Sequence, residues 1–194
     1  MAVDRWILEN KHLDQATLVQ RPETRVPMAQ SWLPPPVGML KLNIDATFSY
    51  GSSNSFAVVV RDFRGLIVHV ETGLTGAVED ALHAEAVAAW RAISWARSMQ
   101  LSSVILESDC QVLINDLSMK SDSLTSAGLL LDAIKSISVC FSSCSFSFVK
   151  RGGNKVADAM AKFQATSLAP FQCFTFSELP ADVAVLVQSD VMVE

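Results

Sequence analysis

The 194-residue sequence lacks the patterns that mark secreted, membrane-spanning and zinc-binding proteins. It shows no N-terminal basic-then-apolar signal and no uncharged apolar run of about 18 residues, which argues against secretion and membrane spanning. Its four cysteines form no CxxC pair and have no histidine at metal-ligand spacing, so we expect buried thiols in a reducing, intracellular compartment. A P-loop, an internal repeat and a Ser-His-Asp arrangement are also missing, and we expect no organic cofactor.

The composition is that of one modest globular domain with additional segments at its ends. Half of the residues (50%) are hydrophobic, which suffices for a sizeable core. We expect an N-terminal tail or linker over residues 1–31, a domain over residues 32–167, and an acidic C-terminal tail or docking segment over residues 168–194. The last segment could pack back on the domain or form a docking arm. The sequence does not predict the oligomeric state.

Hydrophobic periodicity predicts an α/β domain with strands and helices in a defined order. Period-2 and β-branched runs predict strands at residues 40–48, 55–62, 66–72, 103–107 and 143–149. Period-3.6 patterns predict helices near residues 80–98, 109–118, 124–138 and 154–165. The residues DFRG at 62–65 favour a turn, so we expect the second and third strands to form a hairpin.

Four acidic residues lie where this pattern places core, and they are the candidate functional residues. Asp45 lies in the first strand, and Glu85 lies on the edge of the apolar stripe of the first helix. Asp109 follows the fourth strand, where an ordinary role as helix N-cap is an alternative, although Ser108 and Gln111 already form a capping-box pattern. Asp158 lies near the start of the last helix, where compensation of the helix dipole is the alternative. Since ionised acids among apolar neighbours must be paired or bind a metal, together they suggest a metal site.

Six segments of the sequence, in order, resemble the plant reverse-transcriptase-associated branch of type-1 ribonuclease H domains. The segments are 32–36 (WLPPP), 40–45 (LKLNID), 61–65 (RDFRG), 83–86 (HAEA), 107–109 (ESD) and 151–158 (RGGNKVAD). The resemblance implies a ribonuclease H-like fold, with a mixed five-stranded sheet of three antiparallel and then two parallel strands, flanked by helices. It also implies an endonuclease that hydrolyses the RNA strand of RNA–DNA hybrids, with Asp45, Glu85, Asp109 and Asp158 holding two Mg²⁺ or Mn²⁺ ions.

The charge distribution predicts weak contact with phosphates. The net charge is −5, but residues 168–194 hold four acidic and no basic residues. Without the four proposed ligands, residues 41–167 have a net charge of +3, which predicts weak and salt-sensitive phosphate binding. The candidate nucleic-acid contacts are Arg61, Arg64, Lys150, Arg151, Asn154 and Lys155.

Departures from the family pattern leave a second hypothesis open. Cellular members of the family carry a histidine in the loop before the last aspartate, and here that loop reads KRGGN at 150–154. Family members also commonly have glycine after the first aspartate, where this chain has Ala46. The alternative to an enzyme is therefore a catalytically weak or inactive domesticated retroelement module that binds nucleic acid or a protein partner.

Overall fold

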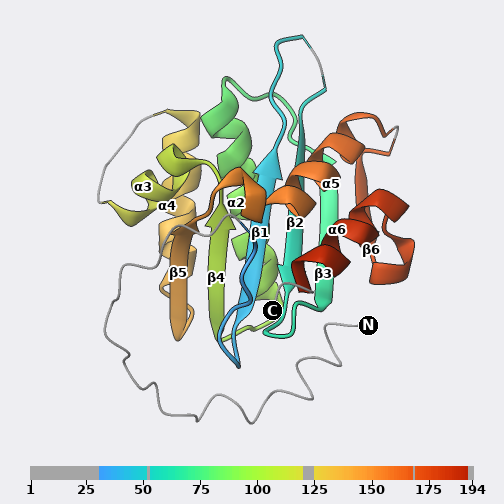
Figure 1. The fold of residues 1–194 in the computed structure, drawn as a ribbon. Coiled ribbons are helices and arrows are strands. Elements are labelled where there is room, and N and C mark those ends of the chain that lie inside the picture. The colour runs from blue at the N-terminus through green and yellow to red at the C-terminus, as the bar shows by residue number, and fades with distance from the viewer. Residues whose placement is uncertain (1–30, 52, 120–124, 168, 192–194) are drawn as a thin grey trace.

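A six-stranded mixed sheet forms the centre of the protein, as the ribbon in Figure 1 shows. The computed structural model describes residues 31–51, 53–119, 125–167 and 169–191, so almost all of the predicted N-terminal segment, residues 1–31, lies outside the described residues. The strand order is β5-β4-β1-β2-β3-β6. The strands are β1 (Leu40–Ala46), β2 (Ser55–Arg61), β3 (Ile67–Leu74), β4 (Ser103–Ser108), β5 (Ser143–Phe148) and β6 (Phe171–Phe174).

The pairing of these strands confirms the predicted mixed sheet and adds one strand. β1, β2 and β3 are antiparallel neighbours, whereas β4 and β5 run parallel to β1. β6, which the sequence did not predict, pairs antiparallel with β3 at the edge of the sheet. The sheet therefore has six strands instead of five. Tertiary pairing, rather than a local pattern, defines β6, because four residues are too few for a clear alternation.

Helices cover both faces of the sheet. One face packs against α2 (Ala81–Ser98), α3 (Gln111–Ser118) and α4 (Ser126–Ser138). The other packs against α5 (Lys155–Ala165) and α6 (Ala181–Val191), which lie in front of the sheet in Figure 1. Short 3₁₀ helices, η2 (Arg151–Gly153) and η3 (Phe176–Glu178), precede α5 and α6. No helix among the described residues is long and apolar enough to cross a membrane.

The two-sided cover explains why polar residues of β1 are buried. Leu40, Leu42 and Ile44 belong to the core shared with α2. The alternating residues face α5, and of these Asn43 is fully buried (0% exposed). In a sheet with one open face, the polar residues of such a strand would face solvent. Here both faces are covered, so the apolar residues of β1 face one buried layer and its polar residues face another.

The C-terminal segment packs back on the domain, which is one of the two arrangements that the sequence left open. Val183 and Val187 of α6 are buried in the second core cluster, with residues of β2, β3 and α5. Asp190, near the end of α6, forms an ion pair with Arg61 at the end of β2, with Nη1 and Oδ2 2.7 Å apart. Apolar burial and one largely buried ion pair thus hold α6 against the sheet.

Candidate active site

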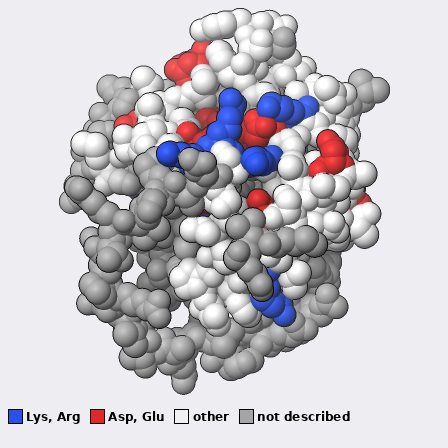
Figure 2. Space-filling model, in the orientation of Figure 1, with Lys and Arg blue, Asp and Glu red and all other residues white. Residues whose placement is uncertain are grey.

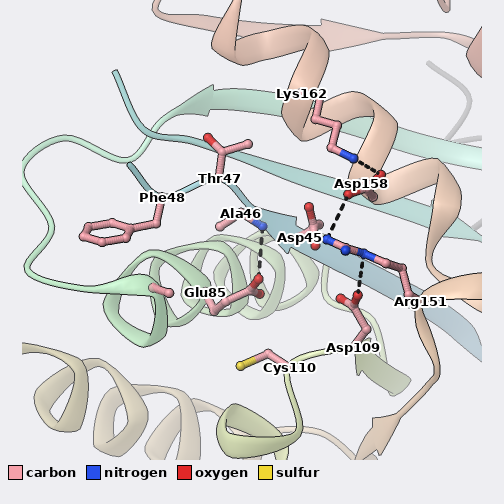
Figure 3. Close-up of a pocket in the computed structure, with 11 residues that line it drawn as sticks. Asp45, Ala46, Thr47, Phe48, Glu85, Asp109, Cys110, Arg151, Asp158 and Lys162 are labelled. Atoms are coloured by element: carbon pink, nitrogen blue, oxygen red, sulfur yellow. Dashed lines mark hydrogen bonds and ion pairs between the residues drawn. The ribbon is translucent and has the colours of Figure 1, made fainter. Parts of the chain in front are cut away.

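The four predicted acids meet at one end of the sheet. Asp45 is near the end of β1, Asp109 directly follows β4, Glu85 lies in the second turn of α2, and Asp158 lies in the first turn of α5. Because β1 and β4 are parallel neighbours, their carboxyl ends lie side by side. All four side chains line one pocket, which also includes Arg151 (Figure 3). In Figure 2, acidic and basic side chains intermingle in the upper half of the face shown.

Glu85 faces inward, as the helical pattern predicted. It is 9% exposed, and small alanine residues on both sides of it let α2 approach β1 closely. The Ala46 backbone N–H donates to Oε1 at 3.3 Å, and the Ser108 hydroxyl lies 3.5 Å from Oε2. Burial raises the pKa of Glu85 well above its usual value, and the nearby Asp45 and Asp109 raise it further.

Asp45 is buried beside other acids of the site. Burial raises its pKa to about 8, and the carboxyl groups of Asp109 and Asp158 add to the effect, while Arg151 opposes it. Asp45 is 7% exposed, so solvent screens these charges only weakly. The fold therefore holds like charges together at a site where no cationic side chain fully compensates them.

Asp109 does not cap a helix, so the alternative role considered for it is wrong. α3 begins at Gln111, two residues later than predicted, with Cys110 at the cap position. The predicted capping box is also absent, because the Ser108 hydroxyl accepts from the Cys110 N–H at 3.0 Å and Gln111 donates to Asn115. The Asp109 carboxylate instead faces the pocket.

Asn154 positions the site rather than exposing its side chain for nucleic acid. It is 1% exposed and stands at the N-cap position of α5 without a side-chain capping bond. Its Nδ2 donates to the Ile44 carbonyl at 2.8 Å and to Asp109 Oδ1 at 3.0 Å. The predicted direct contact with nucleic acid therefore does not fit this structure. Asn154 links β1, the end of β4 and the start of α5.

Two basic residues approach the acids. Arg151 is exposed (78%), and its guanidinium lies 3.8 Å from Asp109 Oδ2 and 3.7 Å from Asp158 Oδ1. Lys162 lies in the next turn of α5, and its Nζ donates to Asp158 Oδ2 at 2.7 Å. It was not among the residues predicted from the sequence. Its spacing of four residues from Asp158 is the signal that could have identified it. Lys150 and Lys155 are exposed on either side of η2.

Arg61 and Arg64, both predicted as phosphate contacts, lie at the opposite end of the sheet from the four acids. Antiparallel pairing aligns Arg61 with Lys41 at the start of β1, whereas Asp45 aligns with Ala57. Arg61 is 1% exposed, because its guanidinium stacks 3.7 Å from the Trp32 ring centroid and pairs with Asp190. The prediction that Arg61 contacts phosphates is therefore wrong in this structure, and Arg61 instead stabilises the fold. Arg64 instead pairs with Asp62 at the hairpin turn.

The donor set of the pocket fits a hard divalent cation. Four carboxylates supply only oxygen ligands, and Mg²⁺ and Mn²⁺ prefer such ligands. Burial is the main cause of the raised pKa of Asp45 and Glu85, and a bound cation would compensate the negative charge of the neighbouring acids that adds to it. No three of the four acids bring oxygens within 4.8 Å of one another, so the side chains would have to close in on a cation.

The arrangement of strands and helices is that of a ribonuclease H-like fold. The sequence model of the reverse transcriptase-like family matches residues 43–164, and the chain belongs to this family. That range includes all four acids. No curated protein sequence matched the chain.

Solved structures of ribonucleases H share the fold at low sequence identity. RNase H1 of the archaeon Halobacterium salinarum aligns with a TM-score of 0.58 and 19% identity, over 64% of this chain and 95% of that one. LC11-RNase H1, solved with an RNA/DNA hybrid, aligns with a TM-score of 0.56 and 16% identity, over 65% and 96%. The foamy viral protease-reverse transcriptase, also solved with a hybrid, aligns with a TM-score of 0.55 and 15% identity, over 84% and 26%.

Proposed function

We propose that this chain is a metal-dependent endonuclease that hydrolyses the RNA strand of RNA–DNA hybrids. The observation that carries the proposal is the convergence of four carboxylates from four separate elements on one pocket, where burial and mutual repulsion raise the pKa of Asp45 and Glu85. A fold keeps such an unfavourable cluster when the cluster has a function. Membership of the reverse transcriptase-like family and the shared fold of hybrid-bound structures support the proposal.

The four acids have different positions and therefore different proposed roles. Asp45, at the centre of the sheet, would contact both of two Mg²⁺ or Mn²⁺ ions, and Glu85 and Asp109 would complete their coordination. Asp158, on α5, would hold the ion on the side of the attacking water. When bound, such ions activate the water and stabilise the leaving oxygen. Asn154 holds the Asp109 carboxylate in place through its hydrogen bond at 3.0 Å.

The basic residues beside the pocket are the proposed substrate contacts. Arg151, Lys150 and Lys155 surround the start of α5 and are exposed. Contacts of this kind are sequence-independent and weaken with salt. Proteins recognise duplexes that contain RNA through their shape, their phosphates and the 2′-hydroxyl groups. We therefore expect cleavage at many sites along a hybrid and inhibition by moderate salt.

The test is a cleavage assay with a labelled RNA–DNA hybrid. The purified chain should cut the RNA strand with Mg²⁺ or Mn²⁺, and cleavage should disappear in EDTA and in Asp45→Asn. Asp182→Asn is the matched control, because it removes an exposed acid of α6 outside the pocket and should leave cleavage unchanged. Equal cutting by the wild type, Asp45→Asn and the EDTA sample would refute the nuclease proposal.

A second function is favoured by the position of Arg151. Its guanidinium pairs with both Asp109 and Asp158, so it competes with a cation for the same oxygens. The alternative is a domesticated retroelement module, of plant origin by resemblance, that binds nucleic acid or a protein partner with little catalysis. Hybrid binding without cleavage at any Mg²⁺ or Mn²⁺ concentration would favour this alternative.

Four free cysteines support the proposal of a reducing, intracellular location. Their predicted burial is wrong for Cys140 and Cys173, which are exposed, and only Cys110 and Cys144 are partly buried.

A further inference from the structure

A second group of metal-ligating side chains lies on the α2 face of the sheet. Among the described residues, His69, Glu71 and Cys173 bring one ligand atom each within 4.8 Å of one another. Glu71 on β3 is directly opposite Cys173 on β6, and His69 precedes Glu71 by two residues on the same face. None of the three lines the pocket of the four acids. Strand pairing therefore brings these residues together, which explains why spacing in the sequence did not reveal them.

The spacing of His69 and Glu71 matches that of two ligands on a small tetrahedral ion. His69 Nε2 lies 3.2 Å from Glu71 Oε2. Ligand atoms at the usual zinc distances of about 2.0–2.2 Å, arranged tetrahedrally, are separated by roughly 3.3 Å. The His69 ring stacks on Trp95 with centroids 4.5 Å apart and an interplanar angle of 9°, so its orientation is fixed.

The neighbouring residues supply the support that metal ligands need. Arg91 Nε donates to Glu71 Oε1 at 3.2 Å, which orients the carboxylate and leaves Oε2 directed at His69. Glu71 is 3% exposed, whereas Cys173 is exposed and gives access from solvent. Zinc sites with three protein ligands leave a fourth coordination position open to water.

We propose that His69, Glu71 and Cys173 form a Zn²⁺ site that links β6 to β3. A thiol and an imidazole select zinc over magnesium, because they are softer ligands than carboxylates. This site is therefore chemically distinct from the four acids.

A reactive thiol is the competing interpretation of Cys173. Desolvation and the Glu71 carboxylate raise the pKa of the Cys173 thiol, and Arg91 lowers it to a smaller extent. A redox or nucleophilic cysteine requires a lowered pKa, since the thiolate is the reactive form.

Zinc at this position would hold the C-terminal segment on the domain. β6 has four residues and only one neighbouring strand, so its pairing with β3 is short. The segment after β6 continues into α6, which packs against α5. An ion bound to both β3 and β6 would stabilise this attachment, since ligands that bind only the folded state raise its stability.

The direct test uses Co²⁺, because a cobalt–thiolate bond gives a charge-transfer absorption in the near ultraviolet. The full chain should bind one equivalent of Co²⁺ with this band, and Zn²⁺, but not a large excess of Mg²⁺, should remove it. The band should disappear in Cys173→Ser and His69→Gln. It should persist in Cys140→Ser, the matched exposed cysteine, in Cys110→Ser, beside the acid pocket, and in Asp45→Asn.

Thermal unfolding provides a second measurement. Zn²⁺ should raise the melting temperature of the wild type and of Asp45→Asn by several degrees and leave Cys173→Ser unchanged. Absence of the band, or a band of equal strength in Cys173→Ser, would overturn the zinc site. A chain that shows the band and the thermal shift but does not cut hybrids would support the zinc site while refuting the nuclease proposal.

Discussion

Replacement of Asp45 by Asn should abolish cleavage and at the same time stabilise the metal-free protein. Asp45 is a buried carboxyl group whose pKa rises from 3.8 to about 8 on folding. Because the unfolded chain releases this proton at a lower pH than the folded chain, folding takes up a proton between these values. The contribution of Asp45 therefore reduces stability progressively as the pH rises from about 4 to about 8.

The pKa difference sets the largest effect that the substitution can have. A tenfold change in proton affinity corresponds to about 1.4 kcal/mol, so the full difference for Asp45 gives an upper limit of roughly 5–6 kcal/mol above pH 8. Glu85 and Asp109 share the same repulsion, and local relaxation relieves part of it. We expect Asp45→Asn to raise the free energy of unfolding at pH 8 by about 1–3 kcal/mol, a trade of stability for function.

Urea unfolding in EDTA at pH 5 and pH 8 measures this effect. The wild type should lose more stability between these two pH values than Asp45→Asn, and the variant should be the more stable protein at pH 8. Asp182→Asn should follow the wild type, because it removes an exposed acid. Added Mg²⁺ should stabilise the wild type at pH 8 and not the variant. If Asp45→Asn is less stable than the wild type at pH 8, or loses stability equally with pH, the cluster is not the source of strain inferred above.

Three further substitutions test other parts of the structure. Arg151→Ala removes the cation that pairs with two of the acids, so half-maximal activity should need two- to fivefold less Mg²⁺, while the KM for the hybrid rises. Activity titrations with Mg²⁺ and with the hybrid measure both effects. If neither value changes, the assigned contacts of Arg151 are wrong. Asp190→Asn leaves the buried Arg61 without its ionic partner and should lower the free energy of unfolding by about 3–5 kcal/mol in urea titrations. Its hybrid KM should stay within about twofold, because the pair lies at the opposite end of the sheet from the acids, and a larger rise would contradict a purely structural role for this pair. Asn154→Ala removes three hydrogen bonds and should cost about 1–3 kcal/mol of stability and lower kcat more than KM, whereas an unchanged kcat would exclude a positioning role.

Sequence patterns predicted the central strands and helices of the fold because those elements bury long, regular apolar faces. β1 and α2 are examples, with alternating and 3.6-residue periods over 7 and 18 residues. The sequence did not predict β6 or α6. β6 is defined by its pairing with β3, and α6 buries only two residues, Val183 and Val187. A narrow apolar stripe in a hydrophobic segment gives no clear period.

Asp45 and Glu85 could be predicted because each interrupts an apolar element, so its burial is visible in the local sequence. Asp109 and Asp158 are only partly buried, and their places after a strand and at the start of a helix drew attention to them. The predictions of Arg61 and Asn154 as nucleic-acid contacts were wrong because tertiary contacts decide the burial of both residues. Both are polar residues that local sequence places at the end of an element, where exposure is the usual outcome. Their actual partners, Asp190 and Asp109, are 129 and 45 residues distant in the chain. No local pattern contains that information.

The buried polar face of β1 shows that burial alone does not distinguish a structural residue from a functional one. Lys41 Nζ lies 2.9 Å from Glu107 Oε2, and Asn43 accepts from the Trp32 indole at 2.8 Å and donates to Glu107 at 2.9 Å. Two residues further along the same face, Asp45 is equally buried, but the charges nearest to it are mostly other acids. Lys41 and Asn43 therefore satisfy their polar groups within the chain and stabilise the sheet. At Asp45 the chain compensates the negative charge only in part, which supports the proposal that a cation from solution binds there.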